Sequence, residues 1–431
     1  VKIAFTKQGE AAPYDEVTVN SDGTFAAKLL TNEVYDVTVV EGPSGYTLSN
    51  LSSTYSLPGG DENPFKNVLL IKNDVDVPYT DTLYVGADKE YKTVNEAVSA
   101  VRMMADKGDK PVTIVIDPGT YKGQVIIDQS NITLKSADES NRPVITSYYG
   151  IGYVYYSLNG GFYNADYAAA KTTKAVASKW GPTLYVTDKG SGFLAENIDF
   201  ENTFNQYVTE EELADGVEMN EKMFERKAGV DVTTKNSTER AAAVAFEGMN
   251  SEFYRCKMVS SQDTLYTGST GYFKECEIYG NTDYIFGGNS VAFDNCDLVW
   301  YGYSDVKSGG YIAACKTSSV TDPGYFFNNC TIKNSNIQGM KFDKGGFGRN
   351  WGGANSAMFF NNITLDGVEK PGGWTAMGGE LSLSRVFVNN VHNVGETIDL
   401  TAGSDNPNGA AQTIPTVEDY VGEWTPVHYT K

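Results

Sequence analysis

Most of the chain consists of short stretches in which hydrophobic and polar residues alternate, separated by turn residues. Near the start, DEVTVNSDGTFAAKL and VYDVTVV show this pattern, with turn signals at Ser21-Asp22-Gly23 and Gly42-Pro43-Ser44-Gly45. Alternation with a period of two predicts strands that bury one face. We expect a small accessory module that resembles a β-sandwich over residues 1–78, followed by a second domain over residues 79–431.

A helical period follows DTLYV, the first strand-like stretch of the second domain. Thr93 and Glu96 have the spacing of a capping box, and hydrophobic residues then recur every three or four positions, at Val94, Ala97, Val98, Val101 and Met104. This pattern predicts a helix over about residues 93–107. After it, PVTIVIDPGTYKGQVIIDQSNITLKS returns to short strand-like runs broken by turns.

An internal repeat dominates the second domain. An aromatic residue and a cysteine stand three positions apart in FYRC, FKEC and FDNC, whose cysteines, Cys256, Cys276 and Cys296, follow one another at intervals of 20 residues. Copies with wider spacings of 34, 33 and 28 residues follow, and a weaker copy precedes them: Phe327-Asn328-Asn329-Cys330, Phe360-Asn361-Asn362-Ile363, Val388-Asn389-Asn390-Val391 and Ala195-Glu196-Asn197-Ile198. A regular internal period of this kind indicates a stacked repeat architecture.

Twenty residues suffice for three short strands and three turns, which is one coil of a parallel β-helix. We therefore predict an all-β solenoid. Stacked coils bury the aromatic and cysteine positions in inner ladders, while asparagines at the turns can bond to their copies above and below. All five cysteines, including Cys315 and Cys330, are expected to be core residues. A disulfide between neighbours such as Cys276 and Cys296 stays open, because geometry decides the pairing.

Two aspartates occupy one position of the repeat. Asp263 follows Cys256 by seven residues, Asp283 follows Cys276 by seven, and the next coil would bring Tyr303 to this place. Equivalent positions on successive coils lie about 4.8 Å apart, so we expect the carboxylates to be neighbours on an outer face. Two such groups cannot both ionise freely, which yields an acid and a base or nucleophile at one pH. The alternative is a pair of exposed turn aspartates without a catalytic role.

Composition and charge narrow the classes of function. The formal net charge is −21, whereas nucleic-acid binding needs a basic surface, so we expect no nucleic-acid partner. No hydrophobic run suggests a membrane span, and the start VKIAFTKQGE has no apolar leader segment, which suggests a processed end. His392 and His428, the only histidines, lie far from any serine in a G-x-S-x-G setting, which argues against a Ser-His-Asp hydrolase. The absence of a C-x-x-C pair argues against a zinc site.

Three segments resemble, in order, the signature segments QDTL(Y), DFIFG and GRPW of the pectin methylesterases, a carbohydrate esterase family also called pectinesterases. They are Ser261-Gln262-Asp263-Thr264-Leu265-Tyr266, Asp283-Tyr284-Ile285-Phe286-Gly287 and Gly348-Arg349-Asn350-Trp351. The resemblance covers roughly residues 82–425. It implies a right-handed parallel β-helix, of the pectin lyase-like kind, that hydrolyses methyl esters of polygalacturonate to pectate and methanol.

Carried over position by position, the resemblance implies roles for four residues. Asp283 is expected to be the nucleophile, Asp263 the general acid and then the general base, Gln262 an oxyanion-hole donor, and Arg349 the group that orients Asp283 and keeps it ionised. Asp283 would attack the ester carbonyl and protonated Asp263 would give its proton to the departing methanol. Asp263 would then activate the water that releases the acyl-enzyme. No metal or cofactor is implied.

Four aromatic residues resemble positions that line the sugar groove of the family: Tyr266, Phe286, Trp351 and, more weakly, Trp374. For each of them, packing inside the coil is the alternative. The chain also departs from the family at three segments, where QAVAL is Ala242-Ala243-Val244-Ala245-Phe246, GxYxE is Gly119-Thr120-Tyr121-Lys122-Gly123 and the proline of GRPW is Asn350. Ala242 removes a second active-site glutamine, which bears on rate and ester preference but leaves the aspartate pair intact.

The leading interpretation is a secreted or cell-surface pectinesterase that acts as a monomer on methyl-esterified homogalacturonan, in pectin degradation or cell wall modification. A pectate lyase of the same fold would need a calcium site of clustered carboxylates with a basic residue. A polygalacturonase would need several spaced aspartates without Gln262 and Arg349. A non-catalytic polysaccharide-binding β-helix is favoured by Ala242 and disfavoured by the presence of all four central polar groups.

Overall fold

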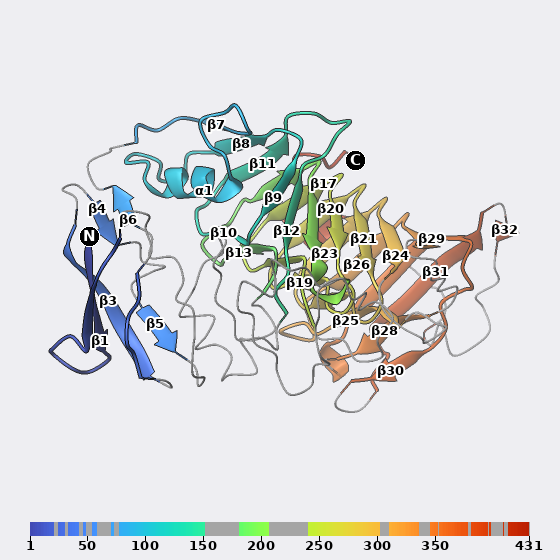
Figure 1. The fold of residues 1–431 in the computed structure, drawn as a ribbon. Coiled ribbons are helices and arrows are strands. Elements are labelled where there is room, and N and C mark those ends of the chain that lie inside the picture. The colour runs from blue at the N-terminus through green and yellow to red at the C-terminus, as the bar shows by residue number, and fades with distance from the viewer. Residues whose placement is uncertain are drawn as a thin grey trace.

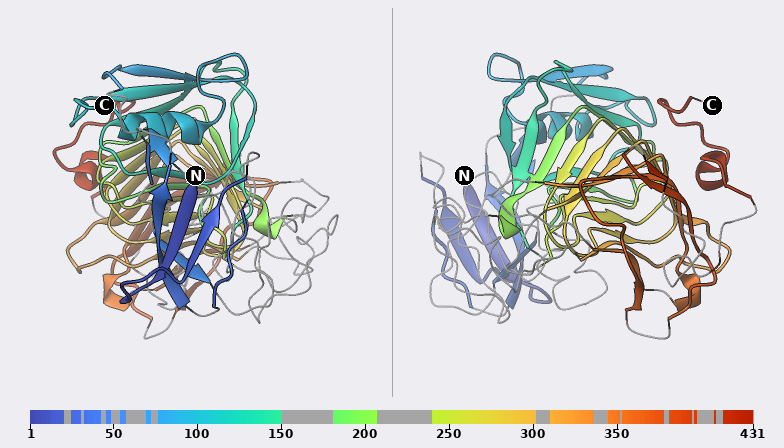
Figure 2. Two further views of the ribbon diagram at one scale, coloured as in Figure 1. Left: turned by 60° about the vertical axis from the view of Figure 1, so that its left-hand side comes forward. Right: turned by 90° about the vertical axis from the view of Figure 1, so that its right-hand side faces the viewer.

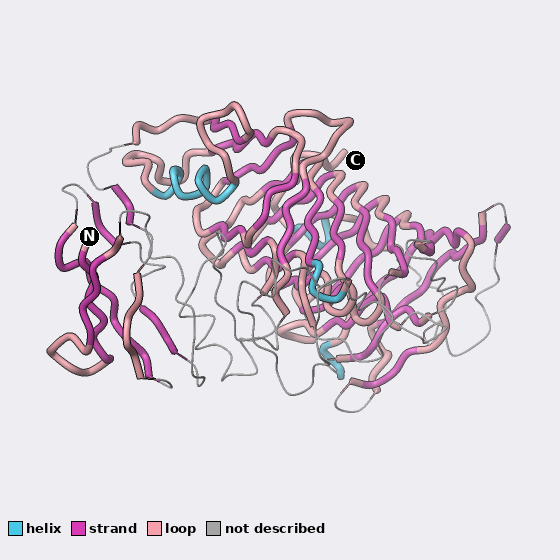
Figure 3. The backbone as a smooth tube through the Cα atoms, viewed as in Figure 1, coloured by secondary structure: helices cyan, strands magenta, loops and turns pink. Residues whose placement is uncertain are grey.

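The protein is mostly strands and turns wound into successive coils (Figures 1 and 3). The computed structural model describes residues 1–20, 25–30, 33–42, 46–48, 54–57, 70–72, 77–150, 181–206, 240–301, 310–335, 345–351, 353–377, 381–394, 396–397, 408 and 413–430. The coils stack along one axis (Figure 2). The all-β prediction and the parallel β-helix are confirmed.

Three rows of parallel strands form the sides of the β-helix. The first row, which we call the site sheet, contains in order β10 (Val125–Ile127), β13 (Leu184–Val186), β16 (Val244–Phe246), β19 (Leu265–Thr267), β22 (Ile285–Gly287), β25 (Tyr311–Cys315), β28 (Gly346–Asn350) and β30 (Trp374–Ala376). The second contains β7 (Thr82–Val85), β8 (Val112–Ile116), β11 (Ile132–Ser136), β14 (Leu194–Glu196), β17 (Ser251–Tyr254), β20 (Gly271–Lys274), β23 (Ser290–Asp294), β26 (Gly324–Asn328), β29 (Met358–Asp366) and β31 (Val386–Asn393). The third contains β9 (Thr120–Lys122), β12 (Val144–Ser147), β15 (Asp199–Asn202), β18 (Lys257–Val259), β21 (Glu277–Gly280), β24 (Asp297–Trp300), β27 (Thr331–Asn334) and the end of β29.

Smaller elements accompany the three rows. The short strand β32 (Glu396–Thr397) pairs antiparallel with β31. The described ranges contain the 3-10 turns η2 (Thr203–Asn205) and η5 (Gly353–Asn355). They also contain the helices α1 (Val94–Arg102) and α5 (Glu418–Val421).

A ladder of stacked phenylalanine rings fills the inside of the coils. Phe253, Phe273, Phe293, Phe327 and Phe360 occupy equivalent positions of the second row and are fully buried. Successive ring centroids are 4.7, 4.9, 4.7 and 4.4 Å apart, and the ring planes lie within 21° of parallel. This spacing is the distance between neighbouring strands of a sheet. The register of the strands therefore follows the repeat that the sequence predicts.

The cysteines line the same interior as free thiols. Cys256, Cys276, Cys296, Cys315 and Cys330 are all buried and none is paired, so the disulfide that the sequence left open is not formed. Burial raises the pKa of the thiols of Cys256, Cys276 and Cys296. A thiol held protonated in this way acts as a small hydrophobic core group.

Asparagines at one turn of the coil bond to their copies, as predicted. Asn362 donates through Nδ2 to Asn329 Oδ1 at 2.6 Å, and Asn390 donates to Asn362 Oδ1 at 2.8 Å. These three residues have left-handed backbone conformations with φ between 47° and 54°, which asparagine tolerates better than most residues. Where Arg255 and Glu275 occupy the turn, an ion pair of 2.8 Å replaces the amide contact.

Helix α1 begins with the predicted capping box. Thr93 Oγ1 accepts from the N–H of Glu96 at 3.1 Å, and the Glu96 carboxylate accepts from the N–H of Thr93 at 3.1 Å. The helix ends at Arg102, before the predicted residue 107, because Met104 instead pairs with Val77 in a parallel bridge.

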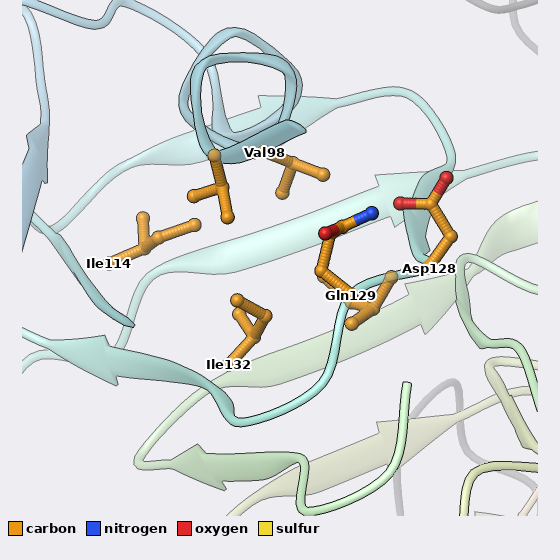
Figure 4. Close-up of a pocket in the computed structure, with 7 residues that line it drawn as sticks. Val98, Ile114, Asp128, Gln129 and Ile132 are labelled. Carbon is orange, nitrogen blue, oxygen red and sulfur yellow. The ribbon is translucent and has the colours of Figure 1, made fainter. Parts of the chain in front are cut away.

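The same helix covers the N-terminal end of the coils. Figure 4 shows Val98 of α1 above Ile114 and Ile132, with Asp128 and Gln129 beside them. Val98, Ile114 and Ile132 belong to the buried core of the β-helix. Because an open solenoid end would expose this core, the helix acts as its cap.

Residues before 78 form antiparallel sheets with a hydrophobic core of their own. One sheet has the order β2 (Asp15–Thr18), β1 (Lys2–Lys7), β3 (Glu33–Glu41) and β5 (Thr54–Leu57), and β4 (Tyr46–Leu48) pairs with β6 (Leu70–Lys72). The buried residues Ile3, Phe5, Val17, Tyr35 and Val37 lie in the larger sheet. Sandwich packing of the two sheets and a domain boundary at residue 78 stay predictions.

The C-terminal segment, residues 413–430, packs on the outside of the second row of strands. Val417, Tyr420 and Val421 form a cluster with Phe326, whose ring stacks on that of Tyr420 at 5.1 Å. His428 Nε2 lies 2.6 Å from Glu196 Oε1. This histidine therefore serves to hold the segment down. Along the described ranges, no helix is long and apolar enough to cross a membrane.

Candidate active site

The two aspartates of the repeat stand at the same position of consecutive coils. Strands β19 and β22 pair with Leu265 opposite Ile285, and Gln262 forms a bridge with Thr282. The backbone N–H of Asp263 donates to the carbonyl of Thr282 at 3.2 Å. One coil step in a parallel sheet is about 4.8 Å, so the structure brings the predicted pair together.

The coil after Asp283 carries Tyr311 at this position, not Tyr303 as the 20-residue period predicts. Strand β25 pairs with β22 so that Ala313 lies opposite Ile285, an interval of 28 residues. The N–H of Asp283 correspondingly donates to the carbonyl of Tyr311 at 2.8 Å. The repeat is lengthened by additional residues between the two strands, and Tyr303 lies outside the described residues.

Both aspartates have left-handed backbone conformations. The φ angle is 60° at Asp263 and 48° at Asp283. Most L-residues pay about 1–2 kcal/mol in this region, whereas aspartate and asparagine tolerate it because their short polar side chains can bond locally. The turns before β19 and β22 therefore favour aspartate for a backbone reason as well as a chemical one.

The aspartates are buried, so the alternative of an exposed pair does not describe them. The exposed fraction is 8% for Asp263 and 1% for Asp283. Removal of water disfavours the charged form of a carboxyl group, and burial raises the pKa of Asp283 above its ordinary value.

Arg349 binds Asp283 with two parallel hydrogen bonds. Its Nε donates to Asp283 Oδ1 at 2.8 Å and its Nη2 donates to Oδ2. The guanidinium lowers the pKa of the Asp283 carboxyl and so opposes the larger effect of burial, while Asp283 raises the pKa of Arg349. Arg349 lies two coils beyond Asp283, since Phe286, Ala314 and Arg349 are opposite one another in β22, β25 and β28.

Tyr311 also contacts this ion pair. The guanidinium carbon of Arg349 lies 5.8 Å from the centre of the Tyr311 ring, which is within the range of a cation–π contact. Reasoning from the repeat missed Tyr311 because the lengthened coil hides its register. Pairing the short stretch YIAAC with YIFG as neighbouring strands would have found it.

Gln262 and Ala242 flank Asp263 in different directions. Gln262 is the preceding residue and is half-buried. Ala242 lies one coil earlier, because Val244 is opposite Leu265. The family glutamine missing at Ala242 would therefore stand beside Asp263, and alanine supplies no side-chain donor there.

Three of the four predicted aromatic residues form a continuous strip on the outer side of the site sheet. The ring centroids of Tyr266 and Phe286 are 5.2 Å apart, and those of Phe286 and Trp351 are 6.4 Å apart. Tyr185 lies in the same column as Tyr266, with Ala245 between them. We call Tyr185, Tyr266, Phe286 and Trp351 the aromatic strip.

Trp374 lies inside the coil, which corrects the prediction that it lines the sugar groove. Its ring stacks on Phe347 at 5.8 Å and meets Phe360 edge-on at 6.1 Å, and its exposed fraction is 6%. It pairs with Gly348, where an added Cβ would lie 2.9 Å from the Trp374 ring. Gly348 of the third signature segment thus makes room for a core tryptophan.

No set of three His, Cys, Asp or Glu side chains within the described ranges gathers closely enough to hold a metal ion. The calcium-dependent lyase depends on such a cluster. The described geometry instead offers two neighbouring carboxyl groups, one of them bound to a guanidinium.

Comparison with known proteins agrees with this geometry. Residues 213–408 match the family model Pectinesterase. The comparison with curated proteins found no match.

Among solved structures, the pectin methylesterase PemA from Erwinia chrysanthemi is 22% identical with a TM-score of 0.57, over 81% of this chain and 99% of its own. The pectin methylesterase from Aspergillus niger is 23% identical with a TM-score of 0.56, over 80% and 95%. That from Yersinia enterocolitica is 26% identical with a TM-score of 0.52, over 72% and 92%.

The matched segment contains both aspartates, Gln262 and Arg349. The solved structures support the right-handed parallel β-helix. Residues 213–408 of this parallel β-helix are therefore similar to the pectinesterases, and the likeness to the solved pectin methylesterases extends over the coils as a whole.

Proposed function

We propose that the protein hydrolyses the methyl esters of polygalacturonate with Asp283 as nucleophile, releasing methanol and leaving pectate. The observation that carries the proposal is the buried Asp283 carboxylate, bound through both oxygens to Arg349 and one coil away from Asp263, within the segment that matches the pectinesterase model. A nucleophilic carboxylate must be ionised, and a fixed guanidinium opposes the effect of burial on its pKa.

In the first step, a carboxylate oxygen of Asp283 attacks the ester carbonyl carbon. The tetrahedral intermediate collapses as Asp263 gives a proton to the departing methoxide, so methanol leaves and an acyl-enzyme with Asp283 forms. In the second step, Asp263 takes a proton from water, and the resulting hydroxide attacks the acyl carbon. Release of the galacturonate carboxyl restores the Asp283 carboxylate and protonated Asp263.

The oxyanion of the intermediate needs a donor, and Gln262 is the candidate. It precedes Asp263 and bridges the backbone beside Asp283 at Thr282, whereas Ala242 offers no second amide. We expect Gln262→Ala to lower kcat about a hundredfold, because one oxyanion donor contributes about 3 kcal/mol to the transition state, with a much smaller change in KM. Steady-state kinetics on methylated pectin measure both constants.

A matched control for this substitution is Gln129→Ala, which removes an amide beside the N-terminal cap (Figure 4). Gln129 follows β10, which lies three coils before β19. It should leave kcat unaltered. A Gln262→Ala effect confined to KM would contradict the oxyanion role and indicate ground-state binding instead.

Methanol release from highly methylated pectin tests the function itself. The assay should contain a chelator, and ultraviolet absorbance should be followed for unsaturated uronides. Methanol production without unsaturated products is the expected result, because ester hydrolysis by two carboxyl groups neither breaks the glycosidic bond nor uses a divalent ion. Unsaturated products would favour the lyase, and binding of pectin without any product would favour the non-catalytic β-helix.

We also infer a setting for this reaction. The substrate would be methyl-esterified homogalacturonan outside the cell or at its surface, where pectin occurs, and the protein would act as a monomer. The aromatic strip supports the sugar assignment, because aromatic faces pack on the C–H faces of pyranose rings. Gel filtration with light scattering would test the oligomeric state.

A further inference from the structure

Two opposite charges stand in one column of the site sheet beside the aromatic strip. Phe246, Thr267, Gly287 and Cys315 lie opposite one another on successive coils. The residues that follow them therefore occupy the next column, which runs Glu247, Gly268, Gly288, Lys316. Three coil steps separate its charged ends, about 14 Å at 4.8 Å a step.

The middle of this column has to be glycine. An added Cβ on Gly268 would lie 2.7 Å from the Phe246 carbonyl oxygen and 2.9 Å from the Tyr266 ring, and one on Gly288 would overlap the Lys316 carbonyl oxygen. The column therefore presents bare backbone alongside Tyr266 and Phe286. A polymer lying on these two rings meets no side chain in this column until it reaches Glu247 or Lys316.

Lys316, at the positive end of the column, contacts the aromatic strip. Lys316 is exposed, and its Nζ lies 5.5 Å from the centre of the Trp351 ring. Trp351 in turn contacts Phe286, which belongs to the same signature segment as Asp283. A sugar carboxylate near Trp351 would therefore find an ammonium group within the reach of a lysine side chain.

Glu247, at the negative end of the column, contacts the same strip on the other side of the aspartates. The carboxylate of Glu247 accepts a hydrogen bond from the hydroxyl of Tyr185 and is half-buried. Phe246 lies one coil before Thr267 and two before Gly287, so Glu247 and Lys316 bracket the Asp263 and Asp283 coils. The strip is thus negative at the Glu247 end and positive at the Lys316 end.

We propose that this charge pair reads the ester pattern of the polymer, with Lys316 selecting a sugar that carries a free carboxylate and Glu247 selecting one that is still a methyl ester. The inference rests on the proposed function and deepens it. Each galacturonate unit is neutral when esterified and anionic when free, so an ammonium group attracts only the free form and a carboxylate repels only the free form. The net charge of −21 disfavours the approach of a free, anionic unit, and a local cation offsets this repulsion.

The test compares two substrates, fully methylated pectin and pectin with about half of its esters removed. The readout is the ratio of kcat/KM on the second substrate to kcat/KM on the first. Lys316→Gln should lower this ratio about threefold to fivefold at low salt, the size expected of one exposed charge. The effect should diminish at high salt, since exposed charges are screened.

Two further variants make the assignment specific. Glu247→Gln, which still accepts from Tyr185, should raise the ratio by a similar factor. Lys110→Gln is the matched control, because Lys110 also lies over an aromatic ring, that of Tyr79 at 4.7 Å, but belongs to the cap region. It should leave the ratio unaltered.

The outcomes separate the two proposals. A wild-type protein that releases no methanol contradicts the proposed function, whereas normal release with the same ratio in Lys316→Gln and Lys110→Gln overturns the role of the charge pair alone. Binding gives a readout without turnover: in the Asp283→Asn background, Lys316→Gln should weaken binding of unesterified oligogalacturonate by the same factor. Equal affinities with and without Lys316 would also overturn the inference.

Discussion

Replacement of Asp283 by asparagine should lower kcat for methyl ester hydrolysis by about a thousandfold or more and leave the β-helix folded. The substitution removes the carboxylate that we propose as the nucleophile and preserves side-chain volume. Asparagine also suits the left-handed conformation at this residue, φ 48°, which alanine does not. The loss would therefore report on chemistry and not on a rearranged turn. Methanol release measures it, and circular dichroism with thermal unfolding checks the fold.

Asp297→Asn is the matched control for this variant. Asp297 also forms an ion pair with a cation of a neighbouring coil, Lys333, but it lies on β24 of the third row, away from the site sheet. Its replacement should leave methanol release at the wild-type rate. Normal turnover in Asp283→Asn, or an equal loss in both variants, would contradict the assignment of the nucleophile.

The position of the aspartate pair could be predicted because it lies where the repeat is unbroken. Between Cys256 and Cys296 each coil has 20 residues, so counting from the cysteines gives the register that the strands show. Beyond Cys296 the coils lengthen, and the same counting points to Tyr303 where the structure has Tyr311. A period predicts register only as long as no residues are inserted between two strands.

Arg349 shows a second limit of the repeat. It reaches Asp283 from two coils away, across β25, and nothing in the periodicity of the sequence links the two residues. The resemblance of the third signature segment supplied it. The burial of Asp283 could not be predicted from the sequence for the same reason, because groups from later coils cover its side chain.

Trp374 failed as a candidate because the strands of the site sheet are short. In a three-residue strand such as β30, alternation cannot show which residue points inward. The deciding feature is Gly348 on the preceding coil, whose missing side chain leaves space for the indole. Tyr266, Phe286 and Trp351 lie on the outer side together, so their common place became visible only with the register.

Removal of the guanidinium in Arg349→Ala should lower kcat/KM about a hundredfold, the order expected when a reacting group loses its fixed orientation, and should move the acid limb of the pH profile upward. Burial raises the pKa of Asp283 and Arg349 lowers it, so without Arg349 the pKa rises further. The carboxylate form then needs a higher pH. Arg349→Lys restores a positive charge without the two parallel bonds. It should return the acid limb toward the wild-type pH while kcat stays low.

The pH dependence of the free energy of unfolding tests independently whether Arg349 lowers the pKa of Asp283. A carboxyl group whose folded-state pKa exceeds its unfolded value contributes stability below the unfolded pKa and loses it as pH rises through the folded pKa. Arg349→Ala raises that folded pKa, so its destabilisation, about 3 kcal/mol for a buried charge left unpaired, should be largest at neutral and higher pH. It should shrink as the pH falls and Asp283 becomes protonated. Denaturant unfolding at several pH values measures this difference. A constant loss of stability together with an unshifted acid limb would mean that Arg349 packs beside Asp283 without governing its charge.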